Sequence, residues 1–326
     1  MLTNLSSDRI SRIRHLARRS ARLASGSLLV EGPQACREAA CQGLVSDLYW
    51  EPRAAERYPA IGLTAEAAGG FLHLASAEYV AAISGDAQGI VAVARDPWAG
   101  LDLTAGLGLT AGLCLTEGLG STAELEPEVD RSRSARPDPA NPPDPVNPPD
   151  GGPDRRDPLV AVFEQLRDPG NAGAVIRSAD AAGASLVVLA DQSVDPASPK
   201  VIRASAGSYF HLPVISAGPV VDWLEQLRQA DLSVYAADGS AEEVLGSPAL
   251  PWNSQALAGP LAWLFGNEAR GLSQSALAAA DRAVRIPLFG QAESLNVAMA
   301  ATLCLSAAAA ARREIVPYAA RHSESR

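Results

Sequence analysis

The feature that most constrains the fold is a regular alternation, after residue 158, of short apolar runs with segments of helical periodicity. Short apolar runs of this kind are typical of strands buried on both faces, and helices between successive strands favour a parallel sheet. We therefore predict an α/β fold in which a mostly parallel sheet is covered by helices on both faces. The expected strands span residues 159–165, 186–190, 212–216, 232–237, 261–265 and 283–287.

A second constraint is the composition of residues 119–157, which include RPDPANPPDPVNPPDGGPDRRDP. Proline, aspartate, asparagine and glycine leave almost nothing to bury, so this stretch is predicted to be a flexible linker. The preceding LDLTAGLGLTAGLCLTEGLG has the composition of a low-complexity insertion. We expect a small N-terminal α/β domain over residues 1–97, the insertion and linker over 98–157, and a larger α/β domain over 158–326.

The charge of the chain is unevenly placed. The 326 residues carry a formal net charge of −10. Residues 1–95 hold 10 basic and 9 acidic side chains, residues 96–157 hold 5 and 12, and residues 158–326 hold 12 and 16. A run of arginines gives the first part a basic face, which is either a solvated helix face or a surface that grips a polyanion. These arginines are Arg9, Arg12, Arg14, Arg18, Arg19 and Arg22.

The sequence disfavours several classes of protein. No long unbroken apolar run predicts a membrane span, and the arginine-rich N-terminus lacks the apolar core of a secretory signal. We therefore expect a cytoplasmic protein with no membrane partner. The cysteines lack the spacing of a zinc site or of a disulfide framework, so we expect reduced thiols and no metal. They are Cys36, Cys41, Cys114 and Cys304.

Polar residues gather in the loops that follow three of the expected strands, at the edge where ligands of parallel sheets bind. Each loop also has an ordinary interpretation: helix caps, a surface arginine, or a carboxylate that interacts with a helix dipole. The order of all three loops is more informative than any one of them. The residues concerned are Asn171 and Arg177, then Gly266 and Glu268, then Ser294 and Asn296.

Taken in order, the three loops resemble the signature motifs of the SpoU (TrmH-like) RNA 2′-O-ribose methyltransferases, a branch of the SPOUT class. The motifs are Asn-x-Gly-x-x-x-Arg-Ser, Phe-Gly-Asn-Glu-x-x-Gly-Leu and Ile-Pro-Leu-x-Gly-x-x-x-Ser-Leu-Asn-Val-Ala, and the similarity covers roughly residues 158–313. Residues 198–214 are similar to the stretch after the second strand of the family. SLLVEGPQACREAA resembles the start of the L30e-like domain that binds the substrate in many members acting on ribosomal RNA.

The resemblance implies a C-terminal trefoil knot around residues 264–300, which would be an exception to the rule that chains are not knotted. It also implies a homodimer formed through the knot domain and S-adenosyl-L-methionine as the methyl donor. No metal is implied, because the methyl group is already activated on sulfur. The residues implied to hold the cofactor are Leu264, Gly266, Ile286, Leu288, Ser294 and Leu295.

The same resemblance gives Arg177 the central catalytic role, with Asn171, Glu268, Ser294 and Asn296 completing a hydrogen-bonded cluster. Methylating a ribose hydroxyl requires the oxygen to be aligned with the sulfonium methyl group and a proton to be removed. In the family the arginine is the general base or its partner. Because a guanidinium normally stays protonated, we favour Arg177 as the group that orients the phosphate and acidifies the hydroxyl, and leave the proton acceptor open.

RNA is the expected partner, and family architecture favours ribosomal RNA of the large subunit over transfer RNA. Two alternatives remain: a non-catalytic RNA-binding or ribosome assembly factor that keeps the fold, and a nucleotide-dependent enzyme of Rossmann type. All five cluster positions are present, which disfavours the first, and neither GxGxxG nor GxxxxGK[ST] occurs, which disfavours the second. The residues expected to contact RNA are Arg9, Arg12, Arg18, Arg19, Arg203 and Arg270.

Overall fold

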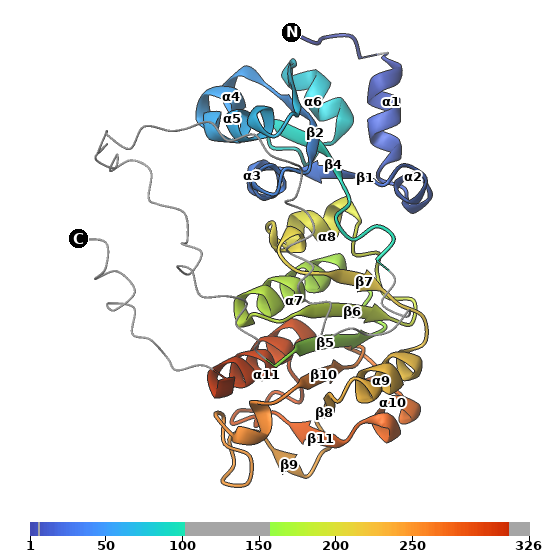
Figure 1. Cartoon of the computed structure of the whole chain (residues 1–326), viewed down its shortest axis with the longest axis vertical. Helices are drawn as coiled ribbons and strands as arrows, with labels where there is room; N and C mark the ends of the chain where they lie inside the picture. The colour runs from blue at the N-terminus through green and yellow to red at the C-terminus, as the bar shows by residue number, and fades with distance from the viewer. Residues whose placement is uncertain (6, 102–156, 313–326) are drawn as a thin grey trace, which may run out of the picture.

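The computed structural model describes residues 1–5, 7–101 and 157–312, which form two α/β units that lie against each other (Figure 1). The N-terminal unit, in blue to cyan, contains a four-stranded sheet, and the C-terminal unit contains a seven-stranded sheet. Most of the predicted insertion and linker lies outside the described residues, so the predicted domain boundaries stay predictions. No helix among the described residues has the length and hydrophobicity needed to cross a membrane.

The N-terminal unit has the strand order β1-β4-β2-β3, in which the first two pairings are antiparallel and the last is parallel. Alternate residues of β4 face opposite ways: Ile90 and Ala92 join the core beneath α3 and α5, whereas Val91 joins a second core beneath α1 and α6. The likeness to the L30e-like domain stays a prediction. The elements are α1 Asp8–His15, α2 Arg19–Ser25, β1 Ser27–Glu31, α3 Pro33–Cys41, β2 Val45–Trp50, α4 Pro52–Arg57, α5 Pro59–Ala67, β3 Phe71–Leu74, α6 Ala77–Ile83 and β4 Ile90–Arg95.

The C-terminal unit has the strand order β7-β6-β5-β10-β8-β11-β9, and every pairing in this sheet is parallel. The predicted fold class, a mostly parallel sheet flanked by helices, is confirmed; the threading of a knot stays a prediction. The elements are β5 Leu159–Glu164, α7 Pro169–Ala182, β6 Leu186–Ala190, α8 Pro199–Ala204, η1 Ser208–Phe210, β7 Val214–Ser216, α9 Val220–Gln229, β8 Ser233–Ala237, β9 Glu243–Val244, η2 Gln255–Leu257, β10 Leu261–Phe265, α10 Gln274–Ala279, β11 Arg282–Arg285 and α11 Val297–Arg312.

Both faces of the seven-stranded sheet are buried, which explains why β5 is apolar at nearly every position. Ala161 and Phe163 point into the layer formed with α7, α8 and α11, whereas Val160 and Val162 point into the layer formed with α9 and α10. Successive residues of a strand point to opposite faces, so a strand covered on both sides needs apolar residues throughout. Helices thus cover both faces, and only the strand ends are left to form a site.

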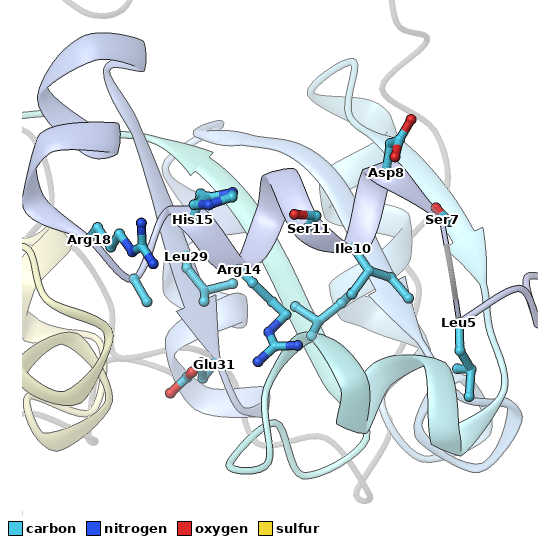
Figure 2. Close-up of a pocket in the computed structure, with 12 residues that line it drawn as sticks. Leu5, Ser7, Asp8, Ile10, Ser11, Arg14, His15, Arg18, Leu29 and Glu31 are labelled. Carbon is cyan, nitrogen blue, oxygen red and sulfur yellow. The ribbon is translucent and has the colours of Figure 1, made fainter.

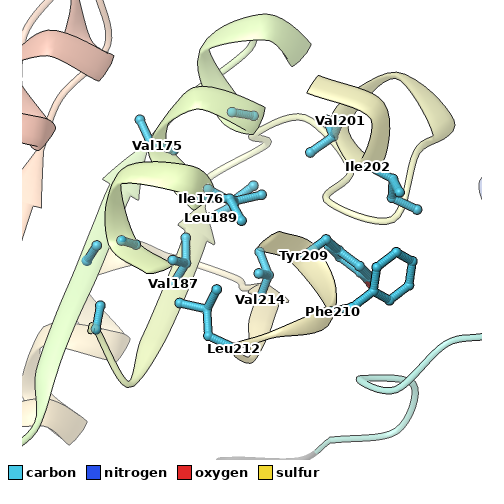
Figure 3. Close-up of a cluster of buried hydrophobic side chains, with 14 of the residues drawn as sticks. Val175, Ile176, Val187, Leu189, Val201, Ile202, Tyr209, Phe210, Leu212 and Val214 are labelled. Atoms are coloured by element: carbon cyan, nitrogen blue, oxygen red, sulfur yellow. The ribbon is translucent and has the colours of Figure 1, made fainter. Parts of the chain in front are cut away.

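Figure 3 shows part of the first of these layers, where α7 and α8 pack on the sheet. Val175 and Ile176 of α7 lie against Val187 and Leu189 of β6, and all four side chains are fully buried. This packing fixes the position of α7, which begins at the end of β5 and carries the first polar loop at its start.

A buried arginine and an ordered tryptophan hold the two units together. Arg22 of α2 is 5% exposed; its guanidinium bonds the carboxylate of Asp195 and donates to the Leu16 carbonyl at 2.6 Å. Trp98, one residue past the predicted end of the first domain, packs against a hydrophobic cluster that includes residues of both units and donates from Nε1 to the Tyr209 carbonyl at 2.8 Å. The chain is therefore fixed to the C-terminal unit beyond the predicted end of the first domain.

Arg203 differs from its expected role as an RNA contact. Its guanidinium lies between the two units, 2.5 Å from the Glu31 carboxylate and 2.8 Å from the Asp86 carboxylate. Two carboxylates more than neutralise one guanidinium, so no positive charge is left over for a phosphate. Sequence reasoning missed this because both partners are more than a hundred positions away along the chain.

His211 forms a fourth contact between the units, and we expect its contribution to stability to depend on pH. Its Nδ1 lies 2.8 Å from Asp180 and its Nε2 lies 3.3 Å from Glu38 of α3. The hydrogen bond to Asp180, with a smaller contribution from Glu38, raises the pKa of His211 above 6.5 although burial opposes this. Burial works to raise the pKa of Asp180, but hydrogen bonds from His211 and Ser208 outweigh it and bring that pKa below 3.8.

The stabilisation from a raised histidine pKa is complete below the unfolded value and is lost as the pH rises through the folded value. That from a lowered aspartate pKa is lost as the pH falls through its folded value. The decrease in unfolding free energy caused by His211→Ala is thus expected to be greatest above the unfolded pKa of Asp180 and below the unfolded pKa of His211. It is expected to be smaller at about pH 9 than at about pH 6. Denaturant titrations at both pH values measure it, and an equal loss at both would contradict the prediction.

Candidate active site

The three polar loops identified in the sequence meet at the carboxyl ends of the strands of the seven-stranded sheet. Nδ2 of Asn171 donates to Oε1 of Glu268 at 2.8 Å, and Nδ2 of Asn296 donates to Oδ1 of Asn171 at 3.1 Å. The carboxamide of Asn171 therefore uses its donor toward the second loop and its acceptor toward the third, which fixes its orientation. Residues about a hundred positions apart are thus joined into one chain of hydrogen bonds, which we call the Asn171 cluster.

The start of α7 explains why Asn171 is free to form this cluster. Asp168, and not Asn171, caps the helix: its carboxylate accepts from the backbone N–H of Asn171 at 2.8 Å, and Pro169 follows at the first helical position. Further along the same helix, Ser178 and Thr302 of α11 share a hydrogen bond of 2.7 Å. This bond holds α7 beside α11, and so holds Asn171 beside Asn296.

The second loop is a tight turn built on two glycines. The backbone groups of Asn267 and Gly271 bond each other at 3.1 and 2.8 Å, and Gly271 has a φ of 68°. A Cβ on Gly266 would lie 2.3 Å from the carbonyl carbon of Gly271, so the turn closes only because residue 266 has no side chain. The turn places Glu268, which is exposed, opposite Asn171.

Two of the residues expected in the cluster are not hydrogen-bonded to its other members among the described residues. Arg177 is exposed on α7 and forms no hydrogen bond or ion pair with the described residues, so its guanidinium is free for a ligand. Ser294 is likewise exposed, and within the described parts of the chain its hydroxyl has no hydrogen-bond partner. The structure therefore joins Asn171, Glu268 and Asn296 by hydrogen bonds, and does not bond Arg177 or Ser294 to them.

Beside the cluster is a hollow of about 330 Å³ with four of the residues expected to hold the cofactor in its wall: Ile286, Leu288, Ser294 and Leu295. Gly266 does not line this hollow, and Leu264 has its side chain fully buried in the core, so only its backbone could reach a ligand.

The wall of the hollow also contains Asp238 and Gly239, from the loop after β8, which the sequence analysis passed over. The Asp238 carboxylate accepts from the N–H of Ser240 at 3.0 Å and from its hydroxyl at 2.9 Å. The available signal was an Asp-Gly-Ser sequence directly after an apolar strand, the same kind of signal that identified the other loops.

The remaining arginines expected to contact RNA are exposed and come from both units. Arg9 and Arg12 lie on α1, Arg18 and Arg19 lie at the start of α2, and Arg270 lies in the second loop. A hollow of about 640 Å³ lies along α1, and Arg14 and Arg18 are among the residues that line it (Figure 2). The carboxylates of Asp8 and Glu31 line the same hollow, so its wall carries both signs of charge.

Within residues 1–5, 7–101 and 157–312, no group of histidine, cysteine, aspartate and glutamate side chains is arranged to hold a metal ion. Cys36 and Cys304 are buried thiols, and burial raises the pKa of each; Cys41 is exposed. Cys114 lies outside the described residues.

Comparison with known proteins gives an independent view of the same region. Residues 158–306 match the model of the SpoU rRNA Methylase family. The chain is 36% identical over 144 residues to the 23S rRNA (guanosine(2553)-2'-O)-methyltransferase RlmP of Bacillus subtilis, over 44% of this chain and 55% of that protein. It is 38% identical over 156 residues to the 23S rRNA (uridine(2479)-2'-O)-methyltransferase of Streptomyces viridochromogenes. This match covers 47% of this chain and 53% of that protein. The chain thus spans about half the length of the curated relatives it matches.

Solved structures are similar over both units. An RNA 2'-O ribose methyltransferase superposes with a TM-score of 0.63 and 28% identity, covering 95% of this chain and 98% of the other. The SpoU methyltransferase AviRb of Streptomyces viridochromogenes, solved in complex with AdoMet, superposes with a TM-score of 0.64 and 25% identity, over 93% and 98%. An rRNA methyltransferase of Sinorhizobium meliloti, with a TM-score of 0.65, 23% identity and coverage of 94% and 96%, shares the fold.

Proposed function

We propose that this chain, whose residues 158–306 carry a SpoU methylase domain, is an S-adenosylmethionine-dependent RNA methyltransferase that modifies a ribose 2′-hydroxyl. The observation that carries the proposal is the Asn171 cluster, in which side chains from all three motif loops are joined by hydrogen bonds. The match of the same residues to the family, and the 2'-O-methyltransferase names of its relatives, support it.

The hollow beside the cluster suits the cofactor. Its volume of about 330 Å³ is within the range of small-molecule sites, and it combines apolar walls with a few polar groups. Ile286, Leu288 and Leu295 offer apolar surface to the adenine, and Asp238 and Ser294 offer polar groups to the ribose or the amino acid part. When bound, S-adenosylmethionine supplies a methyl group already activated on a sulfonium sulfur.

The residues around the hollow then align and activate the acceptor. The free guanidinium of Arg177 binds the phosphate next to the target ribose in two hydrogen bonds, and its charge acidifies the nearby hydroxyl. The Asn171 cluster holds the second and third loops in register, so that the ribose is oriented against the hollow. Positioning of this kind accounts for a large part of the rate of a bimolecular transfer.

The substrate class we propose is ribosomal RNA of the large subunit, with transfer RNA as the alternative. The printed names of both curated relatives describe 23S rRNA, which supports this choice. The exposed arginines of α1 and α2 supply positive charge on the N-terminal unit, which lies next to the seven-stranded sheet of the C-terminal unit (Figure 1).

Methyl transfer from radiolabelled S-adenosylmethionine to separated ribosomal and transfer RNA, taken from cells that lack this protein, tests the proposal. We expect label in ribosomal RNA, at a ribose that then resists alkaline cleavage. S-adenosylmethionine binding without transfer to either RNA or to ribosomal particles would favour the non-catalytic assembly factor. No binding of S-adenosylmethionine would contradict the enzyme.

We also propose a homodimer formed through the C-terminal unit. Large apolar side chains are exposed on the third loop and α11, where Phe289 is 96%, Met299 60% and Leu303 39% exposed. An exposed apolar group of this kind is typical of a subunit interface. Phe289→Asp is expected to weaken dimerisation at least about tenfold, because a carboxylate would be buried at the interface. Sedimentation velocity over a range of concentrations measures this, and a wild-type chain that stays monomeric would contradict the dimer.

A further inference from the structure

The carboxyl ends of the strands carry the Asn171 cluster, and further loops extend along these strand ends toward the N-terminal unit. Nδ2 of Asn267 donates to the Gln165 carbonyl at 2.9 Å at the end of β5, and the Gln165 N–H donates to the Ala190 carbonyl at 3.2 Å at the end of β6. The Asp191 N–H in turn donates to the Gly218 carbonyl at 3.1 Å, beyond the end of β7. Hydrogen bonds therefore connect the candidate active site to a second region of the same edge.

In this second region is a hollow of about 550 Å³, lined by Asp191, Gln192 and Ser193 after β6, by residues 216–219 at the end of β7, and by Arg19 of α2. It offers a guanidinium, a carboxylate, a carboxamide and hydroxyls in one place. A simple anion site would need cations alone, whereas a nucleotide presents a phosphate, ribose hydroxyls and a base edge together. The mixture of groups and the volume both fit a nucleotide.

The N-terminal unit is fixed so that Arg19 reaches this hollow. Arg22, one turn further along α2, is buried and bonded to Asp195 of the loop between β6 and α8. Arg19 itself is exposed and forms no ion pair with any described residue. Arg22 thus acts as the anchor of α2, and the free guanidinium of Arg19 is held over the strand ends.

The backbone at these strand ends is unusual. Gln165, Asp191 and Gln192 have φ values of 55°, 51° and 57°, in the left-handed region that side chains other than glycine rarely occupy. Such conformations persist where the surrounding structure requires them, and they gather at binding sites. Here they end β5 and β6 side by side and leave the Gln192 side chain exposed at the hollow.

We propose that this second hollow binds a nucleotide of the RNA strand that flanks the methylated ribose, an inference that rests on the proposed function. Arg19 binds a backbone phosphate. One oxygen of Asp191 accepts from the Val220 N–H at 2.9 Å, and the other, free of protein partners among the described residues, accepts from a ribose hydroxyl. Gln192 pairs with the edge of the base. Contacts from both units to one strand explain why α2 is locked to the β6–α8 loop.

The test measures the binding of unmodified ribosomal RNA to the full chain as a function of salt concentration. Each phosphate contact on a single strand contributes about −0.7 to the slope of log K against log salt, so Arg19→Ala is expected to make this negative slope shallower by about 0.7. The matched control is Arg53→Ala, which removes the same charge from exposed α4 of the same unit, away from α2 (Figure 1). It is expected to leave the slope unchanged.

A second pair of variants tests the base contact through kinetics. Gln192→Ala is expected to raise the KM for RNA about fivefold at unchanged kcat and unchanged S-adenosylmethionine affinity, whereas Gln42→Ala, an exposed glutamine of the N-terminal unit, changes neither. Equal salt slopes for Arg19→Ala and Arg53→Ala would overturn the second hollow as an RNA site even if methyl transfer is intact. A wild-type chain that binds RNA but transfers no methyl group would instead overturn the proposed function, and the salt slopes would still decide this inference.

Discussion

Replacing Arg177 with alanine is expected to slow methyl transfer at least about 100-fold while the affinity for S-adenosylmethionine stays the same. The guanidinium is exposed, has no ion pair or hydrogen bond with the described residues, and lies outside the wall of the hollow that we assign to the cofactor. Its removal therefore costs little structure and no cofactor contact. What is lost is the positive charge that orients the phosphate and acidifies the 2′-hydroxyl.

The measurement is single-turnover transfer to ribosomal RNA, together with equilibrium binding of S-adenosylmethionine. Arg177→Lys separates two roles, because lysine keeps the charge but loses the two-pronged hydrogen bonding, and an intermediate rate is expected. Arg228→Ala is the matched control: Arg228 lies on α9, on the opposite face of the sheet, and pairs with Asp281 at 3.4 Å. A rate for Arg177→Ala within tenfold of wild type would contradict the catalytic role.

The strands of the C-terminal unit were predictable because burial on both faces leaves a continuous apolar run that local sequence reveals. β5, β6 and β10 lie within the predicted ranges for this reason. β9, with only the residues Glu243 and Val244, was missed, since both are half-exposed and carry no apolar run. The strand order, with β10 between β5 and β8, depends on pairings between distant segments and is not encoded in any local pattern.

The site was predictable to the extent that its residues stand in motifs. Asn171, Glu268 and Asn296 were singled out by position, and the structure joins them by hydrogen bonds. The interface between the units was not predictable, because a surface arginine and an arginine in an ion pair look alike in sequence. Arg22 and Arg203 were both counted as basic surface, and their partners became visible only when the two units were placed together.

Replacing Gly266 with alanine is expected to lower the free energy of unfolding by about 1–3 kcal/mol and to reduce methyl transfer more than that loss of folded protein explains. The new Cβ would lie 2.3 Å from the Gly271 carbonyl carbon and 2.4 Å from the Leu272 nitrogen. Both are backbone atoms, so no side chain can rotate away. The turn must open, which breaks the paired bonds between Asn267 and Gly271.

The consequence for activity follows from what the turn holds. Glu268 lies within it and accepts from Asn171, which in turn accepts from Asn296, so a shift of the turn disconnects all three loops. Denaturant titration and single-turnover transfer measure the two effects separately. The matched control is Gly259→Ala, which adds the same methyl group at a site with no atom within 4 Å, and for which wild-type stability and rate are expected. If Gly266→Ala keeps the wild-type rate among its folded molecules, the Asn171 cluster does not need the turn, and its position in the site is set by α7 and α11 alone.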